Sequence, residues 1–485
     1  MCIRQPSIAV ASLQRFSRLR SLSAVGASYG RLPLNKMTRK TSQNRPPIER
    51  SIDLLTGWPN PTLLPPRDLD KASNQILSNA NNTDVLGYGP DEGYQPLREE
   101  IAKWLNEFYQ PKNAILSASI CISGGASQNL ACVLQTFTDP VYTRNVWMVA
   151  PSYYLACRIF TDSGFDARLR AVPEDEEGID LGYLERGLQE SEKRAQAENN
   201  HEPKIKAPKP WRKIYKHVIY AVPTFSNPSG RIMSLHHRHA LVRLARKYDA
   251  LIVTDDVYDM LQWPSDPSLG PRRMDRAVLP RLVDIDKELD GGPVDAFGNA
   301  VSNGSFSKIV APGCRTGWAE GTEAMAYGIS QTGSSRSGGA PSQLVASFIY
   351  QLLASGTLQN HIYEELQPAY GRRYHLMMRA IETHLLPLGL TLPQANKDVA
   401  GGYFIWLTLP GTLDAIKLTK RALAEENLTI IDGARFEVDG DKNEATRFTK
   451  EIRLCFAWED VDVLQEGVMR LARVIKSEMT GSDEE

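Results

Sequence analysis

The sequence predicts an α/β fold, with a large domain built on a mostly parallel sheet flanked by helices and a smaller α+β domain at the carboxyl end. Two observations lead to this expectation. Up to about residue 354, short apolar runs alternate with helical stretches, and each apolar run ends in a polar turn. From residue 355, a long amphipathic helix leads to strand-like segments such as GGYFIWLTL and EIRLCFAW.

The first 48 residues differ in composition from the rest of the chain. They are rich in Arg, Lys and Ser, contain no acid before Glu49, and place arginines around an apolar stripe in LQRFSRLRSL. This pattern is typical of a mitochondrial presequence, and a disordered basic tail is the alternative. Translation from Met37 would omit the signal and leave the protein in the cytoplasm.

We expect three segments after residue 48. Residues 49–80 form an N-terminal arm that contributes to the small domain, residues 81–354 form the large domain, and residues 355–485 form the small domain. Within the large domain, residues 186–213 are charged and rich in Pro and Lys, while residues 264–297 are rich in Pro, Gly and Asp. Both stretches are predicted to be surface insertions.

Five segments of the large domain read as a buried strand that ends in a polar turn. In chain order they are SASICISGGASQNL, NVWMVAPSYY, HVIYAVPTFSNPSG, ALIVTDDVYDML and AVSNGSFSK. In open parallel sheets, the ligand crevice lies at the carboxyl ends of the strands. We therefore expect these polar turns to converge on one site.

Charge and cysteine usage favour a small molecule as the partner. The chain has 56 Lys and Arg against 57 Asp and Glu, so no global field attracts nucleic acid or an anionic membrane. No segment approaches the roughly 20 apolar residues of a membrane span. The six cysteines lack C-x-x-C spacing, which favours reduced thiols over a disulfide or zinc framework.

The stretch NGSFSKIVAPGCRTGW contains the first candidate for chemistry, Lys308. A buried lysine with a lowered pKa is a nucleophile that forms Schiff bases with carbonyls. Ser305, Ser307 and Arg315 could hold a phosphate beside this amine. A second phosphate element is SGGASQNL, where Gly124 and Gly125 allow a tight turn, and Ala126 and Ser127 present N–H groups at a helix N-terminus. Its spacing is not that of a dinucleotide or P-loop motif.

Polar residues at other strand ends complete a recognisable set. Asp255 ends an apolar strand and would need a cation, such as a protonated pyridine nitrogen. Tyr258 and Asn227 are donors that could reach a phenolate oxygen, and Tyr153 or Tyr154 could stack on a flat ring. Together with Lys308 and the phosphate elements, these residues indicate pyridoxal 5′-phosphate.

The chain resembles the fold-type I, class I/II aminotransferases over roughly residues 50–478. The segment YGPDEGYQPLREEIAKWL is similar to their Y-G-x-x-x-G-x-x-x-L-R-x-x-I-A motif, SNPSG to N-P-x-G, DDVY to D-x-x-Y, and SFSKIVAPGCRTGW to their lysine motif. The S-F-S-K and A-P-G-x-R segments are most similar to those of the 2-aminoadipate and kynurenine aminotransferase branch. The resemblance implies an aspartate aminotransferase-like fold with a seven-stranded sheet in the large domain.

The resemblance also implies a role for each candidate residue. Lys308 would bind the cofactor as a Schiff base, and Asp255 would pair with the ring nitrogen. The other implied cofactor contacts are those of Tyr258 and Asn227 to the phenolate, of Tyr153 to the ring face, and of Gly125, Ala126, Ser127, Ser305, Ser307 and Arg315 to the phosphate. Ala126 departs from the family, in which many members have Ser or Thr, so its phosphate contact must come from the backbone N–H.

Substrate and subunit contacts follow from the same resemblance. Arg453 in EIRLCFAW would bind the substrate α-carboxylate as a bidentate fork, close to Gly57 and Asn227. A surface ion pair is the alternative for this arginine. Tyr88 matches a tyrosine that reaches the phosphate of the neighbouring subunit, which implies a homodimer.

The implied activity is transfer of an amino group from an L-amino acid to a 2-oxo acid, with 2-oxoglutarate as the expected acceptor. A lyase, decarboxylase or synthase using the same cofactor is the alternative, because the scaffold supports all of them. A regulator with an aminotransferase-like half is disfavoured, because about 50 residues precede the fold, too few for a winged-helix domain. Aminoadipate, kynurenine, aromatic and branched-chain donors all stay open.

One further motif, HHRH at residues 236–239, invites a metal interpretation. It follows Ser234, a predicted N-cap, and no carboxylate or cysteine lies at a matching spacing in the sequence. We therefore expect a solvated helix face and no metal site.

Overall fold

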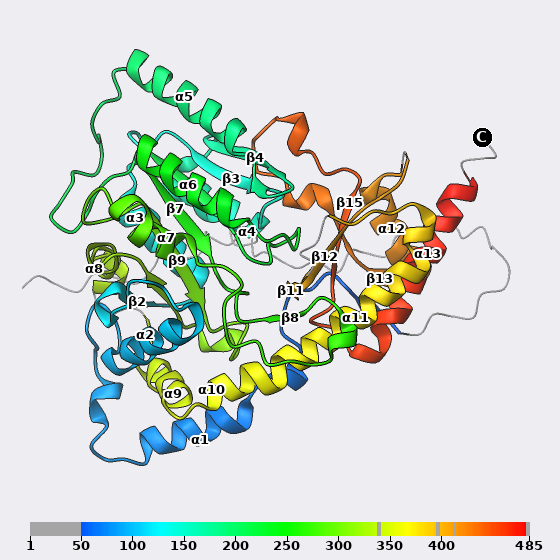
Figure 1. Ribbon diagram of the computed structural model, residues 1–485, viewed down its shortest axis with the longest axis horizontal. Helices are drawn as coiled ribbons and strands as arrows, with labels where there is room; N and C mark the ends of the chain where they lie inside the picture. Colours follow the sequence, from blue (N-terminus) through cyan, green and yellow to red (C-terminus); the bar gives the residue numbers. More distant parts are fainter. Residues whose placement is uncertain (1–49, 337–340, 394–397, 412, 482–485) are drawn as a thin grey trace, which may run out of the picture. The chain divides into compact units, whose positions relative to one another are not determined.

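A computed structural model describes residues 50–336, 341–393, 398–411 and 413–481 (Figure 1). The predicted presequence, residues 1–48, lies outside these ranges, so its role stays a prediction. Within them, no helix combines the length and the apolar character that crossing a membrane requires.

The centre of the large domain is a sheet with the strand order β2-β10-β9-β7-β6-β3-β4-β5. Neighbouring strands from β9 to β4 run parallel, whereas β10 is antiparallel to both β2 and β9. The prediction of seven strands was wrong by one, because the short strand β5 forms a hairpin with β4. The strands are β2 (Ile120–Ser123), β3 (Val146–Ala150), β4 (Leu169–Asp175), β5 (Gly178–Ile179), β6 (His217–Ala221), β7 (Ala250–Asp255), β9 (Ala300–Ser305) and β10 (Gly317–Glu320).

Helices cover both faces of this sheet, which explains its continuous apolar strands. In β7, Leu251 and Val253 pack into one buried cluster, and Ala250 and Ile252 pack into another. The first cluster contains α3 (Ala126–Phe137), α4 (Tyr154–Phe160) and α8 (Glu323–Ser330), and the second contains α5 (Leu181–Ala197), α6 (Leu235–Tyr248) and α7 (Leu282–Glu288). The parallel strands are thereby buried on both sides, and their carboxyl ends are left for a site.

A third cluster joins the N-terminal arm, two helices of the large domain and the C-terminal part. Strand β1 (Ile52–Asp53) pairs in parallel with β13 (Leu428–Thr429), so the arm adds a strand to the C-terminal part. A three-stranded sheet there has the order β12-β15-β14. The remaining elements are α1 (Pro66–Leu77), α2 (Gln95–Tyr109), β8 (Gln262–Pro264), α9 (Gln343–Ala354), α10 (Thr357–Asn360), α11 (Gln367–His384), β11 (Val399–Gly401), β12 (Phe404–Thr408), α12 (Ala415–Glu426), β14 (Ile431–Asp432), β15 (Glu451–Cys455) and α13 (Leu464–Gly481).

The prediction that residues 186–213 and 264–297 are surface insertions was wrong for parts of both. Leu188 at the start of the first stretch is buried in α5, which continues to Ala197. In the second stretch, α7 places Leu282 and Val283 in the core. The charged composition of residues 264–297 suggested exposure, but some of these charges are buried and paired inside the protein. Arg281, for example, is 1% exposed.

A stability prediction follows from Arg281. Its Nη2 lies 2.8 Å from Asp284 Oδ1 and 2.7 Å from Glu320 Oε2, all three side chains being buried. Arg281→Met would leave these carboxylates with less compensating charge, and we expect it to lower the free energy of unfolding by about 3–5 kcal/mol. Arg243→Met, which removes an exposed pair with Asp290, should cost less than about 1 kcal/mol. Thermal midpoints of the two variants provide the comparison, and equal midpoints would contradict it.

Candidate active site

Lys308 lies in the turn that follows β9. Its Nζ donates a 2.7 Å hydrogen bond to the carbonyl oxygen of Gly57 and lies 5.2 and 5.9 Å from the ring centroids of Tyr403 and Tyr258. Burial, with a smaller contribution from the Arg453 guanidinium, lowers the pKa of this amine to about 8. The uncharged amine, which is the state that attacks a carbonyl, is therefore far more populated near neutral pH than in an ordinary lysine, although the protonated form still predominates.

Asp255, at the carboxyl end of β7, is buried and hydrogen-bonded on both oxygens. Tyr220 OH donates to Oδ2 at 2.7 Å, and Asn303 Nδ2 donates to Oδ1 at 2.8 Å. Burial raises the pKa of this carboxyl to about 6, with a further contribution from Asp256. Among the described residues, no cation forms an ion pair with Asp255, so a cationic ligand atom would complete its surroundings.

Tyr220 and Asn303 are site residues that the sequence analysis missed. Asn303 could have been suspected, because its strand, AVSNGS, ends at the predicted site residue Ser305. Tyr220 carried a weaker signal, because its strand, HVIYA, ends six residues before Asn227. Asn303 also donates to the carbonyl oxygen of Ala126 and accepts a 2.9 Å bond from Asn129. It therefore connects the Asp255 carboxylate to the first turn of α3.

The predicted phosphate residues meet at that first turn. Arg315 donates to Ser307 Oγ at 3.3 Å and to the carbonyl oxygen of Gly124 at 3.0 Å, and Ser305 Oγ donates to Ser307 Oγ at 3.0 Å. Gly125 has a φ of +99°, and a Cβ there would lie 2.6 Å from Arg315 Nη2. Glycine is thus required both for the backbone conformation and for the close approach of the guanidinium.

The helix N-terminus adjoining Arg315 is available to an anion. Gly125 is the N-cap of α3 and provides no side-chain cap, while Ala126 and Ser127 begin the helix. Uncapped N–H groups, the helix dipole and an adjacent guanidinium together favour a phosphate at this position. The predicted phosphate elements, far apart in the chain, therefore form one anion site.

Arg453 on β15 is 4% exposed. Its guanidinium carbon lies 3.9 Å from the ring centroid of Phe404, and its Nη1 donates to Asn227 Oδ1 at 3.0 Å. Its Nη2 donates to the carbonyl oxygen of Leu55 at 2.6 Å. The alternative of a surface ion pair is wrong, because this arginine is buried and no acid pairs with it in the part of the chain that the structure describes.

The third nitrogen of Arg453, Nε, is buried and has no hydrogen-bond partner among the described residues. A buried cation in this state favours an anionic ligand, and a carboxylate matches the guanidinium in shape. Gly57 helps to form this position, because a Cβ there would lie 2.8 Å from the ring of Phe404.

The predicted tyrosines occupy different positions. Tyr258 is 4% exposed. Burial and then Tyr153 raise the pKa of its phenol. Tyr153 immediately precedes α4 and is partly buried, and burial and the Asp255 carboxylate raise its pKa. Tyr88, in contrast, is 89% exposed, so this chain alone does not enclose it.

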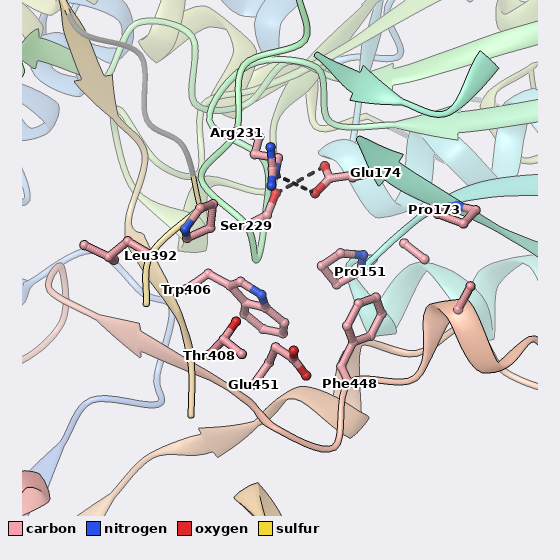
Figure 2. A pocket seen from close by; sticks show the side chains of 13 residues that line it. Pro151, Pro173, Glu174, Ser229, Arg231, Leu392, Trp406, Thr408, Phe448 and Glu451 are labelled. Atoms are coloured by element: carbon pink, nitrogen blue, oxygen red, sulfur yellow. Dashed lines mark hydrogen bonds and ion pairs between the residues drawn. The ribbon is translucent and has the colours of Figure 1, made fainter. Parts of the chain in front are cut away.

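A cavity of about 310 Å³ lies beside these residues and is distinct from the cofactor residues above. Figure 2 shows its polar wall, where Ser229 and Arg231 meet Glu174, and an opposite wall that contains Trp406 and Glu451. None of the predicted cofactor or substrate residues lines it. Two of its lining residues, Ser229 and Arg231, follow Asn227 closely in the chain.

Comparison with known proteins agrees with this geometry. The family model for aminotransferase class I and II matches residues 56–471. An uncharacterized protein of Saccharomyces cerevisiae is 34% identical over 88% of this chain and 97% of its own length, and the 2-aminoadipate transaminase of Thermus thermophilus is 27% identical over 93% and 96%. The crystal structure of Pyrococcus horikoshii kynurenine aminotransferase in complex with PMP superposes with a TM-score of 0.70, at 28% identity and with 88% and 91% of the chains covered.

The chain belongs to the class I and II aminotransferases. It is a pyridoxal 5′-phosphate-dependent enzyme, and the geometry of this aminotransferase fits the cofactor at three places. The α3 N-terminus with Arg315 would hold the phosphate, Asp255, which lacks a cation, would pair with a protonated ring nitrogen, and Lys308 would supply the amine. The resemblance to this family in the sequence is confirmed, as is the α/β fold class.

A kinetic prediction follows from the surroundings of Arg453. Arg453→Met should lower kcat/KM for amino acid and oxo acid alike by about 100-fold or more, because the substrate carboxylate would lose its charged partner. Arg447→Met, which removes an arginine paired with Glu437, is the matched control and should leave kcat/KM unchanged. A loss of less than about threefold in the Arg453 variant would show that the carboxylate binds elsewhere.

Proposed function

We propose that this aminotransferase takes its amino group from an L-amino acid with an aminoadipate-like, aromatic or similar large side chain and uses 2-oxoglutarate as the acceptor. The observation that carries the proposal is the acid-free Arg453, held beside Lys308 by the backbone of Leu55 and Gly57. One carboxylate site next to one amine suits an amino acid and an oxo acid that bind in turn. The relatives named for aminoadipate and kynurenine support the choice of donor.

An aromatic pair next to Gly57 supports a large donor side chain. Trp58 is 62% exposed and lies edge-on to Trp458, with 5.6 Å between the ring centroids. Exposed indole surface next to a carboxylate site favours apolar or aromatic groups over small polar ones. We therefore expect this surface to favour the proposed donors over alanine and serine.

The protein's own residues perform the proton transfers. When bound, the cofactor supplies an electron sink for charge that develops at the substrate Cα. Arg453 fixes the carboxylate and thereby orients the Cα–H bond. Lys308, freed as an amine with a lowered pKa, accepts the Cα proton and returns it as an acid. Asp255, ionised above its pKa of about 6, stabilises positive charge on the ring nitrogen.

An amino-donor screen tests the proposal. Purified protein loaded with cofactor should form glutamate from 2-oxoglutarate with aminoadipate, kynurenine or aromatic donors at higher kcat/KM than with alanine. Lys308→Ala should still bind the cofactor through the phosphate and ring contacts but should lose the transfer, because no amine moves the Cα proton. Turnover of the amino acid without any oxo acid would instead indicate a lyase or decarboxylase. Wild-type turnover by Lys308→Ala would contradict the role of the lysine.

We also propose that the enzyme is a homodimer in which Tyr88 completes the partner's phosphate site. The support is exposure, because Tyr88 is 89% exposed and Leu86 is 66% exposed within one chain. Two exposed apolar side chains this close together would suit a subunit interface. The phosphate site described above has donors from Arg315 and α3, and a tyrosine hydroxyl from a second copy would add one more.

Tyr88→Phe tests this arrangement. The variant should bind pyridoxal 5′-phosphate roughly 10- to 150-fold more weakly, because one hydrogen bond to a charged group is worth about 1.5–3 kcal/mol. Tyr327→Phe, which alters another exposed tyrosine, should bind normally. Light scattering should give twice the chain mass for wild type. A wild-type protein that is monomeric, or a Tyr88→Phe variant with unchanged cofactor affinity, would refute the proposal.

A further inference from the structure

Two histidines in the first turn of α6 lie beside a carboxylate from a distant part of the chain. Ser234 caps α6 and accepts a 3.1 Å hydrogen bond from the backbone N–H of His237, which sets the direction of the turn. The turn between β4 and β5 carries Glu177, whose carbonyl oxygen accepts a 2.9 Å bond from Ser234 N. The sequence showed no acid near these histidines, and the hairpin supplies one.

The ligand atoms of this cluster face a common point. His236 Nδ1 lies 3.9 Å and His237 Nδ1 lies 3.8 Å from the same atom, Glu177 Oε2. One ligand atom from each residue lies within 4.8 Å of the others. Two ligand atoms bound at about 2.1 Å around a tetrahedral ion are roughly 3.4 Å apart. Small movements of His236 and Glu177, whose side chains are 78% and 54% exposed, would close the difference.

His237 provides an independent indication of a ligand. It is only 7% exposed, and its Nδ1 has no hydrogen-bond partner among the residues that the structure describes. A buried, unpartnered nitrogen is unfavourable without a ligand. The other ring nitrogen, Nε2, lies 3.6 Å from Asp175 Oδ2. A carboxylate behind the ring is the arrangement that fixes the tautomer of a metal-binding histidine.

We propose that Glu177, His236 and His237 bind one divalent transition-metal ion of the zinc class, with Asp175 orienting His237. Two imidazole nitrogens and one carboxylate oxygen suit zinc, and they do not suit calcium or magnesium, which prefer oxygen ligands alone. The exposed side of the cluster leaves the fourth position to water. No residue of this cluster is among the cofactor or substrate residues described above.

The site has a physical connection to the substrate loop. Arg231 donates to the carbonyl oxygen of Asp175 at 3.0 Å, and its backbone carbonyl accepts a bond from Ser226 N, next to Asn227. Ser229 donates to Glu174 at 3.2 Å, a contact that Figure 2 shows at the edge of the cavity. A bound ion would therefore connect the β4–β5 turn to α6, and both of these elements adjoin the loop that carries Asn227.

Zinc titration tests the proposal. The sample is the full-length, cofactor-loaded protein without an affinity tag, treated with a chelator and freed of unbound cofactor before the titration. Calorimetry should show one zinc ion per chain. His237→Ala and Glu177→Gln should each weaken binding by at least about tenfold, and Asp175→Asn should also weaken it. His239→Ala, on the same helix but outside the cluster, is the matched control and should bind like wild type.

Thermal unfolding separates a lost ligand from a misfolded variant. Zinc should raise the midpoint of wild type and of His239→Ala, because a ligand that binds the folded state stabilises it. It should not raise the midpoint of His236→Ala, whose altered side chain is largely exposed and whose midpoint without zinc should equal that of wild type. Zinc binding that persists in His237→Ala and Glu177→Gln, or its absence from wild type, would overturn the proposal.

Discussion

Three buried charged side chains without an ion-pair partner are the constraint around which the active site is organised. Among the described residues, Asp255, Lys308 and Arg453 each lack an opposite charge. Burial raises the pKa of the first to about 6 and lowers that of the second to about 8. Burying charge in this way is unfavourable, so the surrounding packing must hold the groups in place. In the proposed function, the cofactor's ring nitrogen and carbonyl and the substrate carboxylate would be their partners.

The site can exist only where three distant segments of the chain meet. Strands β7 and β9 of the large sheet supply Asp255 and precede Lys308, β15 of the small sheet supplies Arg453, and the N-terminal arm supplies the carbonyls of Leu55 and Gly57. The pairing of β1 with β13 holds the arm against the C-terminal part. The arm therefore links Arg453 on the small sheet to Lys308 after the large sheet, because its carbonyl oxygens accept hydrogen bonds from both side chains.

Neighbouring acids in the segment DDVYD illustrate how environment separates roles. Asp255 faces the site, whereas Asp256 accepts bonds from Thr254 and Ser302, and Asp259 accepts one from Tyr109. Burial raises the pKa of all three. Nearby Arg281 lowers the pKa of the latter two and makes them part of the structural core. Asp255 is the one of the three whose pKa Arg281 does not lower, and it is the candidate for a cationic ligand atom.

The sequence alone determined the fold class and the cofactor, and it predicted most of the residues that the structure gathers at the candidate site, because strand ends, the lysine motif and the glycine turn are local patterns with local physical causes. It also placed Arg453 through the family resemblance. The tertiary structure decided what depends on distant contacts. It brought Tyr220 and Asn303 to Asp255, turned part of residues 264–297 into core through the buried Arg281, and set Glu177 beside His236 and His237. None of these follows from sequence spacing, since each joins elements that only the folded sheet and its helices bring within hydrogen-bonding or ion-binding distance.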